Sequence, residues 1–363
     1  MAIENNKLLQ ILRKVADPQS GNDIISMRLV EDLKLEQDSV SFSVNTAGLK
    51  DTEKFQLHEN IQSAILSEYP EAKVNIHFVN KNETKRPLGQ VKNIIAIASG
   101  KGGVGKSTVS VNLALGLKEL GARVGLIDAD LYGPSLPTML GIQDLKPKIR
   151  EMYGRHRIEP IEKYGIQTIS IGNIVEADKA VVLRGPRLGG IIKQFINEVL
   201  WPELDYLVID LPPGTGDIQL SLVQTVPVTA AVIVTTPQEV AVSDAIKAMN
   251  MFRLENINVP IVGVVENMSW FIPEDMPDKK YKIFGEGGGK NLAKASNSVL
   301  LAQLPLIADV RVASDNGEPV VIQENHLARE YYIEMAKKTM QQVAVRNEVL
   351  APTQVVGVNI QQS

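Results

Sequence analysis

Ile94-Ile-Ala-Ile-Ala-Ser-Gly-Lys-Gly-Gly-Val-Gly-Lys-Ser-Thr108 joins an apolar run to a glycine-rich loop. The loop has the pattern Gly-x-x-x-x-Gly-Lys-[Ser/Thr] of a phosphate-binding loop, placed between a predicted strand and a predicted helix. Its glycines allow backbone N–H groups to turn toward phosphate oxygens, and the positive end of the following helix points the same way. We predict that nine residues bind a nucleotide: Gly100, Lys101, Gly102, Gly103, Val104, Gly105, Lys106, Ser107 and Thr108.

Three side chains of this loop have predicted roles of their own. Lys106 is expected to reach the β- and γ-phosphates, which makes it a candidate catalytic residue, and the Ser107 hydroxyl is expected to ligate Mg²⁺. Lys101 is a second lysine, directly after the first glycine. This early lysine narrows a broad motif to one branch of nucleotide-binding proteins.

The composition of the whole chain is that of an ordinary globular protein. Its 363 residues are enough for one large and one small domain, with 44% hydrophobic and 22% charged residues. A net charge of −4 argues against nucleic acid or an anionic membrane as the main partner. The polar N-terminus has no signal-peptide pattern, and the longest apolar runs have only the length of strands. We therefore expect a cytoplasmic protein.

The chain contains no cysteine. Disulfides, thiolate metal sites and cysteine nucleophiles are thereby excluded within these residues. The histidines are scattered, without an i,i+4 pair, and surface or hydrogen-bonded positions are commoner for histidine than metal ligation. We therefore expect no metal ligand among His58, His77, His156 and His326.

Residues 1–80 have the pattern of a small α+β domain. Apolar residues at helical spacing predict helices over 5–15 and 54–66, and alternation or β-rich composition predicts three strands. Those strands are expected over Ile24–Leu35, Ser39–Val44 and Val74–Val79. Residues 81–91 are polar and interrupted by proline, as is typical of a linker.

Residues 92–347 alternate between buried strands and helices, which predicts a doubly wound α/β domain with a mostly parallel sheet. The helices are expected at about 107–120, 189–200, 217–225 and 239–255. The strands are expected at Ile94–Ser99, Val124–Asp128, Tyr206–Asp210, Ala231–Thr235 and Ile261–Glu266. Ligands of such a domain bind at the carboxyl ends of the strands. Residues 348–363 are expected to form a polar, loosely ordered tail.

Acidic residues stand at the carboxyl ends of two of these strands. Asp210 is expected to hold Mg²⁺ through water, and Asp130 to orient or deprotonate an attacking water. Gly214 and Gly216 give a loop that can approach a γ-phosphate and move when it leaves. Each carboxylate taken alone could instead cap a helix or form a turn. A full phosphate-binding loop upstream favours the functional interpretation.

Several motifs resemble those of one known group. The early-lysine loop, Asp128-Ala-Asp130 and Asp210-Leu-Pro-Pro-Gly-Thr-Gly-Asp217 resemble the deviant Walker-A P-loop ATPases of the SIMIBI class. Within that class, further segments resemble the Mrp/ApbC family, and residues 5–80 resemble the MIP18-type (DUF59) domain often placed ahead of it. The further segments are Asp128–Ser135, Arg184–Pro186, Glu266–Ser269, Phe284–Gly289 and Asp315–Pro319.

This resemblance implies an ATP-dependent homodimer with ATP and Mg²⁺ as cofactors. It implies that Lys101 crosses the dimer interface to the partner's nucleotide, that Asp130 positions water and that Asn267 hydrogen-bonds the adenine. Asn267 could alternatively end its strand as a turn former. Arg184 is expected either to contact the nucleotide or the dimer partner, or to be a solvated loop residue.

The resemblance also implies an iron–sulfur cluster carrier that transfers clusters to apoproteins. Many proteins of the family have Cys-x-x-Cys shortly after Asn-Met-Ser, but residues 270–283 contain no cysteine here. Glu274, Asp275 and Asp278 are hard oxygen donors and poor ligands for iron–sulfur chemistry. We therefore expect any cluster to be held by unusual ligands, by external thiols or by a partner or assembly protein.

Two other classes of function remain open from the sequence. A MinD/ParA-like positioning ATPase would share Lys101, Asp130 and Asp210. The end of this chain, Val355–Ser363, lacks the basic amphipathic face that a membrane-binding helix needs. A nucleotide-dependent scaffold would explain the missing cysteines but would not need the hydrolytic residues.

Overall fold

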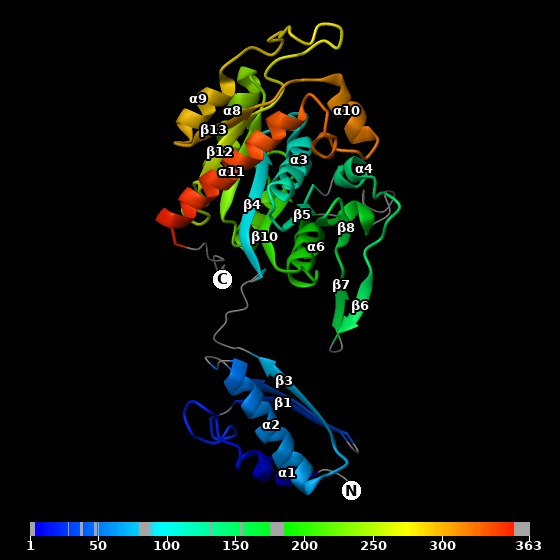
Figure 1. The fold of residues 1–363 in the computed structure, drawn as a ribbon. Helices are drawn as coiled ribbons and strands as arrows, with labels where there is room; N and C mark the ends of the chain where they lie inside the picture. The colour runs from blue at the N-terminus through cyan, green and yellow to red at the C-terminus, as the bar shows by residue number, and fades with distance from the viewer. Residues whose placement is uncertain are drawn as a thin grey trace. The chain divides into compact units, whose positions relative to one another are not determined.

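A computed structural model describes residues 4–27, 29–36, 39–46, 49, 51–79, 88, 90–130, 133–152, 155–174 and 185–351. The chain divides into two compact units, residues 1–86 and residues 87–363, and each is described by itself (Figure 1). No helix in the described part of the chain combines the length and apolar character needed to cross a membrane.

The first unit is a three-stranded sheet packed against two helices. Strand β2 pairs antiparallel with β1 and parallel with β3, and helix α2 makes the crossover between β2 and β3. One face of β2 is fully buried through Val40, Phe42 and Val44, as its alternating sequence predicts. The elements are α1 (Asn5–Leu12), β1 (Val30–Glu36), β2 (Ser39–Asn45), α2 (Asp51–Glu68) and β3 (Lys73–Val79).

The predicted strand over Ile24–Leu35 is wrong in its first part. The Asp23 carboxylate accepts hydrogen bonds from the backbone N–H groups of Ile25 (3.1 Å) and Ser26 (2.7 Å), which closes a turn there. The strand begins only at Val30. Buried Ile24 contributes to the core from this turn, so its apolar character does not indicate a strand.

The second unit is built on an eight-stranded sheet in the order β13-β12-β11-β4-β10-β5-β9-β8. All neighbouring strands are parallel except β8, which runs antiparallel to β9. The predicted doubly wound, mostly parallel sheet is therefore confirmed. The strands are β4 (Val91–Ser99), β5 (Val124–Asp128), β8 (Ile161–Lys163), β9 (Ile166–Ser170), β10 (Leu204–Asp210), β11 (Ala230–Thr235), β12 (Ile261–Glu266) and β13 (Val299–Gln303).

Helices cover both faces of this sheet (Figure 1). Apolar residues of α3 and α11 share one core with one face of the strands, and those of α6, α7, α8 and α9 share the other. A small hairpin of β6 (Ile149–Met152) and β7 (Arg155–Ile158) extends from the unit. The helices are α3 (Lys106–Glu119), α4 (Leu136–Leu140), α6 (Gly185–Asn197), α7 (Asp217–Thr225), α8 (Glu239–Phe252), α9 (Gly288–Ala295), α10 (Ala308–Asp315) and α11 (Arg329–Val349).

The central strand β4 explains why this sheet lies between two helical layers. Ile95 and Ile97 point into the core beneath α3, whereas Ile94, Ala96 and Ala98 point into the opposite core. An uninterrupted apolar strand buries both of its faces, which is the pattern of a parallel sheet covered on two sides. The glycine-rich loop that follows β4 is thereby joined to a strand whose second half is buried on both faces.

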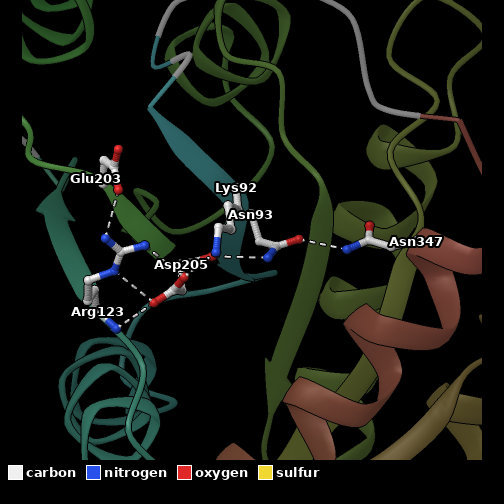
Figure 2. Close-up of polar contacts among 6 residues, drawn as sticks. All are labelled: Lys92, Asn93, Arg123, Glu203, Asp205 and Asn347. Atoms are coloured by element: carbon white, nitrogen blue, oxygen red, sulfur yellow. Dashed lines mark hydrogen bonds and ion pairs between the residues drawn. The ribbon is translucent and has the colours of Figure 1, made fainter.

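A network of hydrogen bonds and ion pairs joins the amino-terminal ends of strands β4, β5 and β10 (Figure 2). The Asp205 carboxylate accepts from Lys92 Nζ (2.8 Å) and from the Arg123 backbone and guanidinium (3.0 and 3.2 Å). Asn93 Nδ2 donates to the Asp205 carbonyl (3.0 Å), and Asn347 Nδ2 of α11 donates to Asn93 Oδ1 (2.8 Å). One carboxylate therefore links the starts of β4 and β5 to β10. Hydrogen bonds from Arg123 and Lys92 hold the pKa of Asp205 well below its usual range.

Replacing Asp205 by Asn should destabilise the unit at neutral pH, with a melting temperature lower by about 2–4 °C. A depressed carboxyl pKa contributes stability above the unfolded-state value of 3.8 and loses it as the pH falls toward the folded-state value. The difference from the wild-type protein should therefore shrink below about pH 4. Thermal unfolding between pH 7 and pH 3 measures this. Glu203→Gln, which removes the more exposed partner of Arg123, should have a smaller effect, and a pH-independent Asp205→Asn difference would contradict the assignment.

Candidate functional site

The carboxyl ends of four parallel strands gather polar residues at one edge of the sheet. Strand β4 leads into the glycine-rich loop, β5 ends at Asp128, β10 ends at Asp210 and β12 ends at Glu266. Asp210 is paired in register with Asp128 on one side and with Ile97 of β4 on the other. Residues more than a hundred positions apart therefore meet around the loop.

The glycine-rich loop is shaped by a close contact with Asn267, the residue after β12. Gly105 has a φ of 81°, and a Cβ there would lie 2.2 Å from Asn267 Nδ2. That Nδ2 atom donates to the Val104 carbonyl at 2.9 Å, and Asn267 is buried. Glycine is therefore required at 105 both by its backbone conformation and by the neighbouring amide. Asn267 lies against the loop itself, a contact that the sequence does not predict.

Lys106 is held by the acidic residues of the site. Its Nζ lies 2.9 Å from Asp210 Oδ1 and 3.7 Å from Asp130 Oδ2, and the lysine is only 6% exposed. Ser107 Oγ donates to Asp210 Oδ2 at 2.6 Å. The structure thus brings together four of the predicted residues: Lys106, Ser107, Asp130 and Asp210.

Ser110 is a site residue that sequence reasoning missed. Its hydroxyl donates to Asp210 Oδ1 at 2.6 Å from the first turn of α3. Asp210 is completely buried, and a buried carboxylate needs several donors to offset its lost hydration. Its position three residues after Ser107 places Ser110 on the same side of the helix, which is the signal that could have found it.

Asp128 is the register partner of Asp210 on the neighbouring strand β5, and it is fully buried, whereas Asp130 is partly exposed. It accepts hydrogen bonds from Ser170 Oγ (2.9 Å) and from the Asp130 backbone N–H (3.1 Å). Burial, followed by the charge of Asp210, raises the pKa of Asp128 to about 7. Its protonation state therefore changes near neutral pH, and the buried site carries less negative charge when Asp128 is protonated. No motif in the sequence indicated that Ser170 belongs to this site.

Lys101 is half-buried, and within the described part of the chain no hydrogen bond or ion pair holds its ammonium group. The loop after β10 approaches the same region, because the Gly214 N–H donates to the Ser99 carbonyl at 2.9 Å. Arg184 lies outside the described residues.

Glu266 connects three segments just behind Asn267. Its Oε2 atom accepts from the Gly289 N–H (2.6 Å), and its Oε1 atom accepts from Ser269 Oγ (2.9 Å) and Gln303 Nε2 (2.7 Å). A Cβ at Gly289 would lie 2.6 Å from Glu266 Cβ, so this close approach needs glycine at position 289. The buried Glu266 therefore anchors both ends of the segment 270–287.

The chemical groups at the carboxyl ends of the strands fit a nucleoside triphosphate with Mg²⁺. A lysine, a serine hydroxyl, a buried aspartate and the N-terminus of a 14-residue helix converge on the loop. They do not fit an iron–sulfur cluster, because the chain has no thiolate. Among the described residues, no three His, Asp or Glu side chains are grouped as metal ligands.

Comparisons with solved structures identify the fold. A nucleotide-binding protein from Archaeoglobus fulgidus, in complex with ADP, matches with a TM-score of 0.59 and 34% identity, over 70% of this chain and 97% of that one. The septum site-determining protein MinD from Pyrococcus horikoshii, complexed with Mg-ADP, matches with a TM-score of 0.52 and 21% identity, over 71% of this chain and 99% of that one. The second likeness shows a shared fold only.

Comparisons of sequence identify the family. Residues 5–78 match the family model described as iron-sulfur cluster assembly protein, and residues 90–341 match the one described as NUBPL iron-transfer P-loop NTPase. An iron-sulfur cluster carrier protein of Deinococcus radiodurans is 42% identical over 353 residues, covering 96% of this chain and 99% of that protein. One of Synechocystis is 42% identical over 329 residues, covering 89% and 92%. Because these matches extend over nearly the whole of both chains, the protein belongs to the family of NUBPL iron-transfer P-loop NTPases, with an iron–sulfur cluster assembly domain ahead of the NTPase domain.

Proposed function

We propose that the protein hydrolyses ATP as a dimer and carries iron–sulfur clusters to apoproteins. The observation that carries this proposal is the contact of buried Lys106 and Asp210 with Ser107 and Asp130. It supplies the groups that phosphoryl transfer needs, in a family whose curated relatives are named cluster carriers. The cluster is the cargo of this reaction.

Binding of ATP would exchange partners within the site. Lys106 would leave Asp210 and Asp130 for the β- and γ-phosphates, and the loop N–H groups would donate hydrogen bonds to the phosphate oxygens. Ser107 and, through water, Asp210 would hold Mg²⁺, which neutralises charge on the β- and γ-phosphates when bound. Once Lys106 has moved to the phosphates, the Asp130 carboxylate would orient the attacking water.

Lys101 would act on the nucleotide of the other subunit. Its ammonium group is partly exposed, and no acceptor holds it within the described part of its own chain. A cation supplied from a second copy would stabilise charge on the transferring phosphoryl group. Hydrolysis would then depend on dimer formation.

The chain would contribute the ATP-driven rearrangement and leave the thiol ligands to another molecule. It contains no cysteine, and its exposed carboxylates in 274–278 are hard donors. A partner protein or a small thiol is therefore needed to ligate iron. A change in dimer contacts on hydrolysis would bias release of the cargo toward the apoprotein.

Mixing two inactive variants tests the shared site. Lys101→Ala and Asp130→Asn should each lower ATP turnover about 100-fold or more. In a mixed dimer, one site would combine an intact Asp130 with the partner subunit's Lys101. Random exchange of subunits between equal amounts of the two variants makes about half of the dimers mixed, and each mixed dimer has one intact site. About a quarter of the wild-type turnover should therefore return. If each lysine served only its own subunit, mixing would restore nothing.

The role of Asn267 is tested by comparing ligands with and without a base. Because its side chain donates to the Val104 carbonyl, Asn267→Ala should loosen the loop. It should weaken ADP and inorganic tripolyphosphate alike, each by about five- to tenfold in Kd. Isothermal titration calorimetry measures both. If only ADP binding weakens, Asn267 serves the adenine and not the loop.

Anaerobic reconstitution tests the carrier function. With iron and sulfide alone, the chain should retain no stable cluster, because it has no thiolate. With a cluster donor held by glutathione, ATP should accelerate transfer to an apoprotein severalfold. Asp130→Asn is the matched control and should abolish the ATP effect. No change in delivery under any nucleotide, with or without partner proteins, would contradict the carrier function.

A further inference from the structure

Gln219 is a buried glutamine whose amide group is unpaired. It lies in the first turn of α7 and is only 1% exposed. Within the described part of the chain, neither its Oε1 atom nor its Nε2 atom has a hydrogen-bond partner, and no other described side chain buries two unpaired polar atoms. Removing an amide from water without replacing its hydrogen bonds costs folding free energy, and such groups are rare in folded proteins. The stability of this structure therefore does not explain the glutamine.

The packing of α7 does not explain it either. By helical spacing, residues 219, 222 and 223 lie on one side of the helix. Leu222 and Val223 are buried in the core that α7 shares with α6, α8 and α9. A leucine at 219 would continue this apolar side and would bury no polar atom. The amide instead stands at the start of α7, which follows the carboxyl end of β10.

The backbone just before α7 holds a donor for this amide. Gly216 is the N-cap residue of the helix, with extended φ and ψ angles of −73° and 169°. Gln219 is therefore the third helical residue, from which a glutamine side chain reaches back to the N-cap N–H in a capping box. Long side chains on a helix also lean toward its N-terminus. In the structure, the Gly216 N–H donates to no acceptor among the described residues, so this capping bond is not made.

The loop 211–216 is attached to the glycine-rich loop through Ser99 and has room to move. The Gly214 N–H donates to the Ser99 carbonyl at 2.9 Å, and the Ser99 hydroxyl donates to the Lys101 carbonyl at 3.0 Å. A Cβ added at Gly214 or at Gly216 would meet no atom within 4 Å. A ligand bound to the glycine-rich loop can therefore shift residues 214–216 without a steric clash.

We propose that Gln219 is a positioning residue that favours the triphosphate-bound form of the loop 211–216. Without a nucleotide, the unpaired amide raises the free energy of the empty state. When the γ-phosphate draws the loop toward it, the Gly216 N–H moves to Gln219 and donates to its Oε1 atom. This bond is lost when the phosphate leaves, so ADP gains nothing from it and the two nucleotides are distinguished. The inference rests on the proposed function in that ATP supplies this phosphate.

Replacing the amide by an apolar group of similar size tests this role. Gln219→Leu should raise the melting temperature of the nucleotide-free protein by about 2–4 °C, because it removes two unpaired buried atoms. It should weaken the binding of a non-hydrolysable ATP analogue with Mg²⁺ about tenfold in Kd, while the Kd of ADP stays within about twofold. Thermal unfolding gives the first quantity, and isothermal titration calorimetry gives both dissociation constants.

The matched control is the same substitution later in the same helix. Gln224 is half-buried in the last turn of α7, and Gln224→Leu should change neither dissociation constant. If Gln219→Leu melts at a lower temperature or fails to fold, the amide already has partners in the empty protein and the inference is wrong. Equal effects on the ATP analogue and on ADP, or no effect on either, would also overturn it. None of these measurements uses turnover or subunit exchange, so failure of the Lys101 and Asp130 mixing experiment would contradict only the proposed dimeric ATPase.

Discussion

The ion pair between Lys106 and Asp210 is the constraint on which the nucleotide edge depends. Asp210 is fully buried and Lys106 nearly so, and two such charges persist only when donors and acceptors surround them. Ser107 and Ser110 complete the shell around the carboxylate. A ligand that takes Lys106 away leaves Asp210 uncompensated, unless a cation arrives with it. If phosphate and Mg²⁺ bind here as we propose, their binding would therefore be energetically coupled. The hydrogen bonds from Ser107 and Ser110 to Asp210 hold the start of α3 to β10 in the structure.

The sequence was most informative where local pattern alone determines structure. Strands β5 and β12 and helix α7 begin and end where predicted, because continuous apolar runs and turn residues bound them. Helix α11 runs to Val349 and was not assigned, because its charged residues obscure the buried side that includes Tyr332 and Met335. Strand β13 was missed because it is short and only partly buried.

The contacts of the site that were missed join distant segments of the chain. Ser170 reaches Asp128 across 42 positions, and Asn267 reaches Val104 across 163. Nothing in the neighbouring sequence of Ser170 distinguishes it from any other strand-end serine. Glu266 was quoted only as part of a motif, yet it joins Ser269, Gly289 and Gln303. Such roles follow from strand order in the sheet, which a single sequence does not supply.

The missing thiolates restrict how this chain can act on a cluster. A protein without soft ligands gains little by binding iron directly. Under the proposed function, its influence on transfer would come from different affinities of its ATP and ADP states for the molecules that hold the cluster. Glu266 and Asn267 are consecutive, and Glu266 anchors the segment 270–287 while Asn267 contacts the glycine-rich loop. If the glycine-rich loop shifts on hydrolysis, as the proposed function implies, the shift would have a short covalent route to the segment 270–287. Such a route would carry the effect of the nucleotide to the far end of this segment without any thiolate on the chain.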